Sequence, residues 1–272
     1  MFNTKALLLF LSLLFIATPA LSKTEETLAV GWELWYPYQY RNENQELVGL
    51  DLDIFHAILK RANLTANFAE LPWKRHLNYI KTGQMDVAMG ASYTKERDSY
   101  ALFTMSYRQE TIKLFVRKGN AKNILLDNLK ELSDSGYKIG VEGGYYYGKE
   151  YETLIKTTAF RAHITEVLDL EQNIKLLMKG QLDGVLVDPF TMQAFIKKYK
   201  MHDAFEQHSL QIYSDDIQIM ISKKSNVKNL LPKINKAIQS LKKDGTLTEI
   251  INNWTQLVKS DGISITKMQQ HQ

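Results

Sequence analysis

The chain of 272 residues contains no cysteine. Disulfide bonds and cysteine metal sites are therefore excluded, and an exported protein of this sequence has to be stable by packing alone. An excess of one charge is missing too, because 34 Lys and Arg against 30 Asp and Glu give a net charge of only +4. The basic residues are spread along the chain with only short clusters at 197–200 and 223–224, and the lack of a basic stripe with interleaved aromatic residues argues against nucleic-acid binding.

Signatures of common enzymes and metal sites are also missing. The six histidines show no paired metal spacing such as HExxH, and neither G-x-S-x-G nor GxxxxGK[ST] occurs. Acidic residues are plentiful, but no pair is marked as an acid and a base. The sequence predicts no catalytic residue, metal site or cofactor, and we expect a protein that is not an enzyme.

Only one long apolar run occurs, and it stands at the N-terminus. Residues 1–22 combine a single positive charge at Lys5, an apolar stretch from Ala6 to Ile16 and small residues at Ala20 and Ser22. This is the layout of a secretory signal peptide, and the stretch is well short of the roughly 20 residues that span a bilayer. We expect cleavage near Ser22 and a soluble mature protein in the periplasm, with a net charge of +4 − 1 = +3.

A short unit occurs twice. In residues 81–90 and 179–188 a helical pattern ends in Lys, Gly and Gln, and an apolar residue, an Asp and a short apolar run follow. Gly can end a helix, and the run is short enough for a buried parallel strand. Two such units predict two similar α/β lobes, and ligands of open α/β sheets bind beyond the carboxyl ends of the strands. Candidate site residues therefore follow each run.

Strand-like apolar runs alternate with helical patterns over most of the chain, which favours an α/β fold with largely parallel sheets. No linker rich in Gly, Pro or Ser separates the halves, which fits two lobes joined by crossing strands. After Trp254 the periodicity is lost, and we expect a frayed tail. Strands are expected near 28–32, 67–71, 86–90, 113–118, 137–144, 182–188 and 217–222, and helices near 51–62, 73–82, 126–132, 189–200, 229–241 and 247–254.

The residues after the two repeated strands have two interpretations each. Ser92 to Arg97 could open a helical turn capped by Thr94, whose exposed amides and Arg97 would bind a carboxylate, or it could be a surface turn with a solvated Arg. Asp188 could bind an ammonium group, or cap the helix that begins at Pro189. The two roles of Asp188 can coexist.

Aromatic residues crowd the first strand and the loop after it. Such residues at strand ends make flat walls for an organic ligand and can face a cation, although about half of them are expected to be core residues. The group comprises Trp32, Trp35, Tyr36, Tyr38 and Tyr40, with Trp73 at the start of a later loop.

Several segments stand in an order typical of one protein family. They are Tyr36-Pro37-Tyr38, Val48 to Asp53, Gly83, Asp86, Gly90 to Arg97, Phe103 to Tyr107, Asp183, Asp188, Leu241 to Thr246 and Trp254. In their order and spacing these segments resemble the family 3 extracellular solute-binding proteins, the polar amino-acid receptors of ABC importers. The resemblance covers nearly all of the mature chain.

The resemblance implies an α/β, periplasmic-binding-protein-like (type II) clamp of two lobes, with a mainly parallel sheet in each lobe and two hinge strands. Residues 24–108 and 217–258 would form lobe 1, 109–216 lobe 2 and 259–272 a tail. The monomeric protein would capture a small polar amino acid or similar zwitterion and deliver it to an ABC permease in the inner membrane. Alternatives are a lyase of the cyclohexadienyl dehydratase type, with Glu142 or Glu33 as the acid, and a receptor that presents its ligand to a sensor.

The resemblance also implies roles for single residues. Arg97 would bind the ligand carboxylate, Asp188 its ammonium group, Ser92 and Thr94 would add hydrogen bonds, Trp73 would stack on the ligand, and Glu33 and Tyr36 would line the cleft.

Two departures from the family pattern affect the ligand. Gly144-Tyr145-Tyr146 stands where many members have Gly and small hydroxyl residues, so phenols there would reshape the pocket around Gly144 and Tyr145. Lys74 and Arg75 stand beside the expected cleft, where they would meet a second acidic group of the ligand or lie at the rim.

Overall fold

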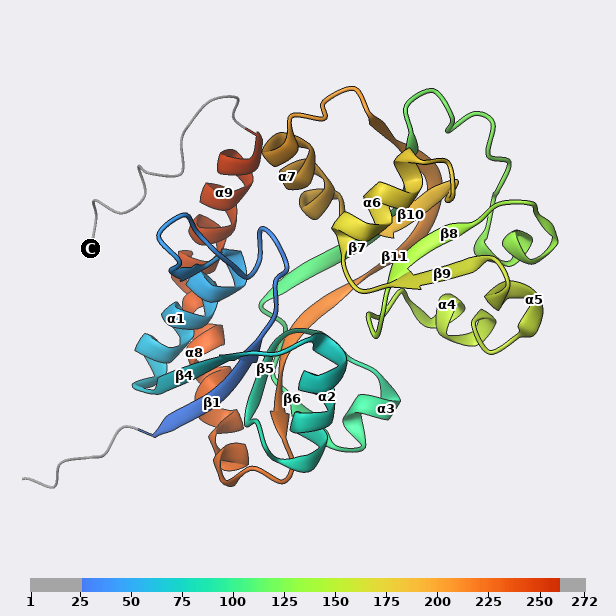
Figure 1. The fold of residues 1–272 in the computed structure, drawn as a ribbon. Coiled ribbons are helices and arrows are strands. Elements are labelled where there is room, and N and C mark those ends of the chain that lie inside the picture. Colours follow the sequence, from blue (N-terminus) through green and yellow to red (C-terminus); the bar gives the residue numbers. More distant parts are fainter. Residues whose placement is uncertain (1–25, 260–272) are drawn as a thin grey trace, which may run out of the picture.

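The computed structural model describes residues 26–259, so the expected signal peptide and the last residues of the expected tail lie outside the described part. One mixed sheet of nine strands runs through the molecule in the order β4-β1-β5-β11-β7-β10-β8-β9, with β6 paired to β11 (Figure 1). The strands are β1 (Thr27–Trp32), β4 (Thr65–Glu70), β5 (Val87–Ser92), β6 (Ala101–Phe103), β7 (Arg108–Arg117), β8 (Ile139–Glu142), β9 (Ile164–Val167), β10 (Gly184–Val187) and β11 (Phe205–Ser222). A separate hairpin joins β2 (Tyr40–Arg41) and β3 (Leu47–Val48).

The sheet is parallel at both ends and antiparallel in the middle. Strands β4, β1 and β5 are parallel neighbours in one half, and β10, β8 and β9 in the other. Between them β5 pairs with β11, β11 with β7 and β7 with β10, all antiparallel. This arrangement confirms the predicted α/β class with a mainly parallel sheet in each half, joined by two long strands.

The two long strands are much longer than the sequence pattern indicates. Their register runs from Arg108 opposite Ile217 to Arg117 opposite Phe205, with irregularities near Gln211. The prediction that the last strand begins near residue 217 is wrong, because β11 begins at Phe205. Exposed Ser214, Asp215 and Asp216 interrupt the apolar alternation there, although their backbones pair with β7. The lobe boundaries at 108 and 217 stay a prediction.

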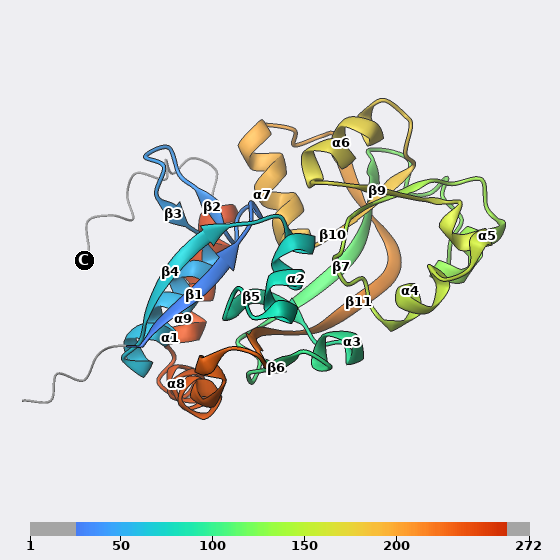
Figure 2. The same ribbon diagram turned by 60° about the horizontal axis from the view of Figure 1, so that its bottom comes forward.

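In the first half, helices cover both faces of the sheet (Figures 1 and 2). Helices α1 (Leu50–Ala62), α8 (Leu231–Lys243) and α9 (Thr246–Lys259) enclose the main core, in which Leu52, Phe55, Ile58 and Leu59 of α1 are buried as predicted. Helices α2 (Trp73–Thr82) and α3 (Lys95–Asp98) and the 3-10 turn η2 (Asn226–Leu230) complete this half. The expected fraying after Trp254 is wrong as far as Lys259, because α9 continues and buries Val258.

In the second half, two apolar clusters lie around β7, β8 and β10. Their helical elements are η1 (Leu129–Asp134), α4 (Lys149–Leu154), α5 (Thr158–Arg161), α6 (Leu170–Met178) and α7 (Pro189–Tyr199). Within residues 26–259, no helix combines the length and apolar character that crossing a bilayer requires.

A buried ion pair ties the start of β7 to the first turn of α1. Arg108 donates from Nε to Asp51 Oδ1 at 2.7 Å and from Nη2 to Asp51 Oδ2 at 2.9 Å. The two side chains are 3% and 0% exposed, and the guanidinium carbon lies 4.0 Å from the ring centroid of Tyr38. Each charge is thus satisfied inside the protein.

Removing one charge of this pair leaves the other buried and unpaired. We predict that Asp51→Asn lowers the free energy of unfolding by about 3–5 kcal/mol in urea denaturation. Asp203→Asn, which neutralises an exposed carboxylate, is the matched control and should have little effect. Equal stability of the two variants would contradict this assignment.

Candidate functional site

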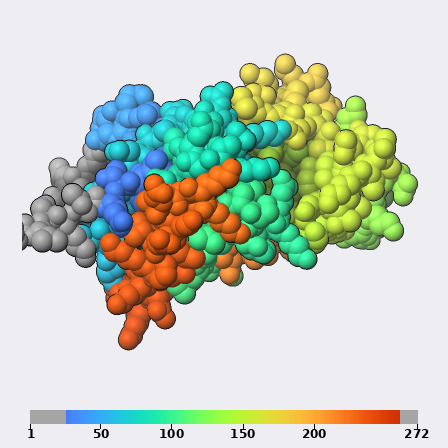
Figure 3. Space-filling view, turned by 90° about the horizontal axis from the view of Figure 1, so that it is seen from below, coloured from blue at the N-terminus to red at the C-terminus, as the bar shows by residue number. Residues whose placement is uncertain are grey.

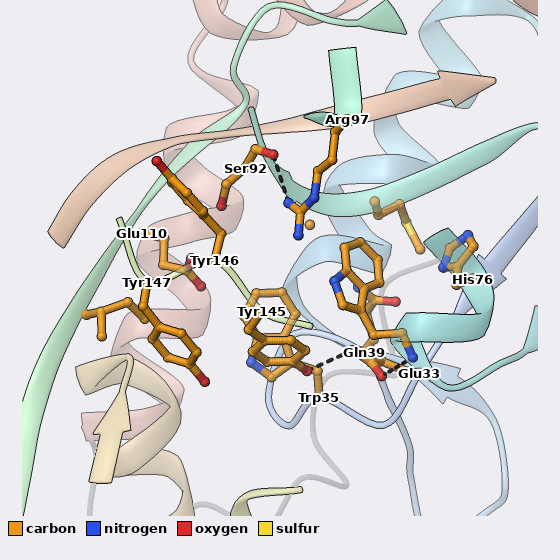
Figure 4. Close-up of a pocket in the computed structure, with 14 residues that line it drawn as sticks. Glu33, Trp35, Gln39, His76, Ser92, Arg97, Glu110, Tyr145, Tyr146 and Tyr147 are labelled. Atoms are coloured by element: carbon orange, nitrogen blue, oxygen red, sulfur yellow. Dashed lines mark hydrogen bonds between the residues drawn. The ribbon is translucent and has the colours of Figure 1, made fainter. Parts of the chain in front are cut away.

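A small cavity lies between the two halves, beyond the carboxyl ends of β1 and β5 and beside β7 (Figure 4). Its volume is about 30 Å³. Such a space holds a water molecule or two but no amino acid. The cavity is lined by Glu33, Trp35, Gln39, Trp73, His76, Met89, Gly90, Ser92, Arg97, Glu110, Ile112, Tyr145, Tyr146 and Tyr147.

Most of the residues predicted for the site meet at this cavity. Glu33, Trp73, Ser92, Arg97 and Tyr145 line it. Gly144 lies beside it through its carbonyl oxygen, which accepts a hydrogen bond from Arg97. Tyr36, Thr94 and Asp188 do not line the cavity in this conformation.

Arg97 reaches into the cavity from α3, directly after β5. Its backbone N–H donates to Thr94 Oγ1 at 3.1 Å, so Thr94 caps the turn. The guanidinium donates to the carbonyl oxygens of Ser92 at 2.9 Å and Gly144 at 3.2 Å, and lies 5.6 Å from the Trp73 ring centroid. Burial lowers the pKa of Arg97, which is 7% exposed.

The positive charge of Arg97 has no carboxylate partner among residues 26–259, where its hydrogen bonds go to uncharged carbonyl oxygens. A buried charge without a counter-ion costs free energy. An anionic group that entered the cavity would remove this cost and could accept two parallel hydrogen bonds from the guanidinium. The turn capped by Thr94 and the anion site are therefore compatible.

Tyr145 extends from the second half toward Trp35 and Trp73 of the first half. Its ring centroid is 5.9 Å from that of Trp35 and 6.5 Å from that of Trp73. Its hydroxyl donates to Glu33 Oε1 at 2.7 Å, and Glu33 Oε2 accepts from the backbone N–H of Trp73 at 2.8 Å. The phenol of the second half is thus enclosed by aromatic rings of the first half.

Three of the polar contacts between the two halves lie at the cavity and its rim. Besides the bonds of Tyr145 to Glu33 and of Arg97 to Gly144, Lys74 forms an ion pair with Glu166 at the rim. In Figure 3 the teal residues around α2 lie against the yellow-green residues of the other half. These contacts join the two halves directly at the cavity and its rim in this conformation.

Asp188 lies elsewhere, in a more open hollow of about 510 Å³ that Tyr38, Arg108 and Phe190 also line. Its Oδ1 accepts from the Tyr38 hydroxyl at 3.0 Å and from the backbone N–H of Thr191 at 2.9 Å. The carboxylate therefore caps α7, as one of its two interpretations expects. Its binding of an ammonium group stays a prediction.

Tyr36 packs away from the cavity. Its ring centroid lies 4.7 Å from that of Tyr40, and Lys198 Nζ lies 5.2 Å from it. Tyr38 and Tyr40 are core residues, whereas Trp35 lines the cavity.

Sequence reasoning missed Glu110 as a cavity residue. The strand period of two offered a signal, because it places Glu110 on the same side of β7 as Arg108 and Ile112. Tyr147, which also lines the cavity, gave no such signal, because the turn after β8 and not a period directs it.

The fold and the cleft define a two-lobed binding protein, and comparison with known proteins agrees. Residues 28–257 match the profile of the bacterial extracellular solute-binding proteins, family 3. The chain belongs to this family.

Individual relatives show the same relationship. A putative ABC transporter arginine-binding protein of Escherichia coli (strain K12) is 29% identical over 248 residues, covering 89% of this chain and 96% of the relative. The structure of an ancestral arginine-binding protein bound to arginine has a TM-score of 0.69 at 27% identity, covering 85% of this chain and 98% of the other. A histidine kinase sensor domain similar to periplasmic binding proteins has a TM-score of 0.73, 19% identity and coverages of 85% and 96%, which shows a shared fold.

Two buried carboxyl groups, those of Glu33 and Glu110, line the cavity, and Glu142 ends β8 beside the cavity residue Tyr147. Burial raises the pKa of Glu33 to about 7, although hydrogen bonds from Tyr145 and Trp73 oppose the shift. Burial raises the pKa of Glu110 and of Glu142 to about 8, with Arg108 opposing the shift at Glu110 and the charge of Glu33 adding to it at Glu142. These groups therefore keep protons that the unfolded chain loses near its ordinary pKa of 4.5.

This difference makes stability depend on pH. Between the ordinary and the raised pKa the folded protein binds more protons than the unfolded chain, so the free energy of unfolding falls as pH rises from about 5 to 8. We predict that Glu110→Gln matches wild type near pH 5 and is more stable near pH 8.5, by at least about 1.4 kcal/mol, the value of one pKa unit.

Urea denaturation at the two pH values measures this effect. Exposed Glu150→Gln on α4 is the matched control and should follow wild type at both. A Glu110→Gln effect that is equal at both pH values would show that packing and not ionisation is responsible.

Proposed function

We propose that this protein captures a small polar amino acid or similar zwitterion between its halves in the periplasm and delivers it to an ABC importer of the inner membrane. The observation that carries the proposal is the buried guanidinium of Arg97, which faces the cavity with no carboxylate partner in the described chain. An amino acid always carries a carboxylate. Its binding would supply the missing counter-ion.

The surrounding residues suit the rest of such a ligand. Trp73 lies against Arg97 and offers a flat wall for the ligand, and Ser92 stands at the end of β5 within the same cavity. The charges of Asp188 and Arg97 both act on the pKa of Glu110. An ammonium group near Glu110 and Asp188 would lie close to two buried carboxyl groups.

Entry of a ligand requires a change of conformation, because about 30 Å³ is available. We infer that the halves separate by bending of β7 and β11, that Tyr145 leaves the space between Trp35 and Trp73, and that ligand contacts then stabilise closure. Gly144, which precedes Tyr145, has a φ of +86°, a left-handed conformation that favours glycine. The turn at Gly144 therefore directs the Tyr145 phenol toward Trp35 and Trp73.

The relatives support this class of ligand. The protein from Escherichia coli is named as an arginine-binding protein of an ABC transporter, and the ancestral protein was solved with arginine. At under 30% identity these names support an amino acid as the ligand without selecting one.

We infer binding rather than catalysis, since the named relatives are binding proteins. The lyase alternative uses Glu142 or Glu33 as an acid, and both have a raised pKa. Turnover of prephenate or arogenate by the purified protein would contradict the inference, and tight binding without turnover would support it.

A thermal-shift screen of amino acids tests the proposal. A ligand at about 100 times its Kd stabilises the folded protein by about 2.7 kcal/mol. We predict that Arg97→Ala abolishes this stabilisation, because the ligand carboxylate then lacks its counter-ion. Lys95→Ala, an exposed charge of the same helix, should retain it. If Arg97→Ala is stabilised as much as wild type, the carboxylate does not bind there.

A further inference from the structure

The hydroxyl of Tyr213 is a buried polar group beside the candidate site that has no hydrogen-bond partner among residues 26–259. Burial raises the pKa of Tyr213 above its ordinary value of 10.0, and the Ser92 side chain opposes this rise, so the two hydroxyl groups lie near each other. Their contact does not have the geometry of a hydrogen bond. A buried donor without a partner costs free energy, and the folded protein keeps one here, next to a residue that lines the cavity.

An irregularity of β11 directs Tyr213 toward the cavity. Gln211 pairs with Lys113 of β7, whereas Tyr213 pairs with Ile112, so β11 has one residue more than β7 between these two pairs. Such a bulge changes the direction of the side chains that follow it. Residues that stand opposite each other in an antiparallel pair lie on the same face of the sheet, and Ile112 lines the cavity. Tyr213 therefore lies on the cavity side of the two long strands.

Residues of the second half hold the ring of Tyr213 in place. Tyr146, which lines the cavity, meets it edge-on, with the ring centroids 5.2 Å apart and the ring planes at 87°. The ring also lies directly against Gly148, where a Cβ atom would be only 2.8 Å from Cδ2 of Tyr213. These contacts involve the ring and not the hydroxyl. The position of the hydroxyl is therefore fixed by packing, while its hydrogen-bonding capacity is unused.

The neighbours of Tyr213 in the first half include Arg97. Burial lowers the pKa of Arg97, and Tyr213 is among the groups that oppose this shift, so the phenol and the guanidinium act on each other. A guanidinium has donors only and cannot accept the phenol hydrogen. Glu110 and Asp215 also act on the pKa of Tyr213, but neither accepts a hydrogen bond from it. A carboxylate has two oxygens and could accept from the phenol and from the guanidinium together.

We propose that Tyr213 is a ligand-binding residue of this site, whose hydroxyl donates a hydrogen bond to the same ligand carboxylate that pairs with Arg97. The inference rests on the proposed function and adds a residue that neither the family resemblance nor the relatives assign.

The position of Tyr213 gives this hydrogen bond a further consequence. Its ring packs on Tyr146 and Gly148 of the second half, whereas Arg97 belongs to the first half. A carboxylate bound by both residues would connect the two halves at the long strands. It would therefore stabilise this arrangement of the halves over one in which they separate.

The variant Tyr213→Phe removes the hydroxyl and keeps the ring that Tyr146 and Gly148 contact. A thermal-shift screen of the twenty standard L-amino acids selects the one that stabilises the wild type most, and isothermal titration measures its affinity for wild type and variant. A hydrogen bond to a charged acceptor is strong enough for us to expect binding to Tyr213→Phe that is weaker by about tenfold or more. Tyr199→Phe, which changes an exposed tyrosine of α7, is the matched control and should bind as wild type does.

Urea denaturation without ligand separates a binding role from a structural one. Because the hydroxyl has no partner in the ligand-free protein, Tyr213→Phe should not lower the free energy of unfolding. A crystal structure of the complex is an independent measurement. It should place the Tyr213 hydroxyl at about 2.7 Å from an oxygen of the ligand carboxylate.

Wild-type affinity of Tyr213→Phe would overturn the inference. So would a weaker affinity with an equal loss of stability in the absence of ligand, or a crystal structure in which the carboxylate contacts Arg97 but not Tyr213. If Arg97→Ala abolishes binding in any of these cases, the proposed function stands without Tyr213. If none of the twenty amino acids binds the wild type, the proposed function fails and the role of Tyr213 fails with it.

Discussion

The antiparallel pairing of β7 with β11 places every other part of the site. One side of β7 carries Arg108, Glu110, Ile112, Leu114 and Val116 in alternate positions. Arg108 fixes the strand to α1 through Asp51, and Glu110 lines the cavity. Ile112, Leu114 and Val116 pack into the core of the second half. A single strand therefore spans the first half, the cleft and the second half. Its register with β11 sets the distance between them.

The buried charged residues fall into two groups, a structural ion pair and the unpaired residues of the candidate site. The charges of Arg108 and Asp51 are buried and fully paired, which makes them structural. Arg97 and Glu110 are buried to a similar extent but are not paired with each other. Burying these groups without a partner costs free energy, which other contacts of the folded protein have to offset. A ligand that carries both charges would supply the missing partners, and the removal of this cost would contribute to the free energy of binding. Tyr145, with its hydroxyl on Glu33, occupies part of that space until then.

The sequence predicted the local elements well because they follow from periodicity and capping. Helix α2 spans Trp73–Thr82 as expected and ends at Gly83, whose φ of 84° is that of a left-handed cap. The pattern around Arg97 gave the turn capped by Thr94. Both features depend on residues close together in the chain.

What the sequence could not provide depends on contacts between distant residues. The first half of β11 is polar and partly exposed, and its strand conformation comes from pairing with β7. Tyr145 lies between Trp35 and Trp73 only because the two halves meet. The position of Asp188, beside Tyr38 and away from the cavity, likewise depends on how α7 packs. The periodicity of a sequence carries no information about contacts between residues that are far apart in the chain.

A crystal structure of the complex with the amino acid that gives the largest thermal shift tests the central claim most directly. The account predicts that the ligand carboxylate accepts hydrogen bonds from the Arg97 guanidinium, and that Tyr145 has left the space between Trp35 and Trp73. A ligand whose carboxylate binds elsewhere, with Tyr145 still between the two rings, would contradict it.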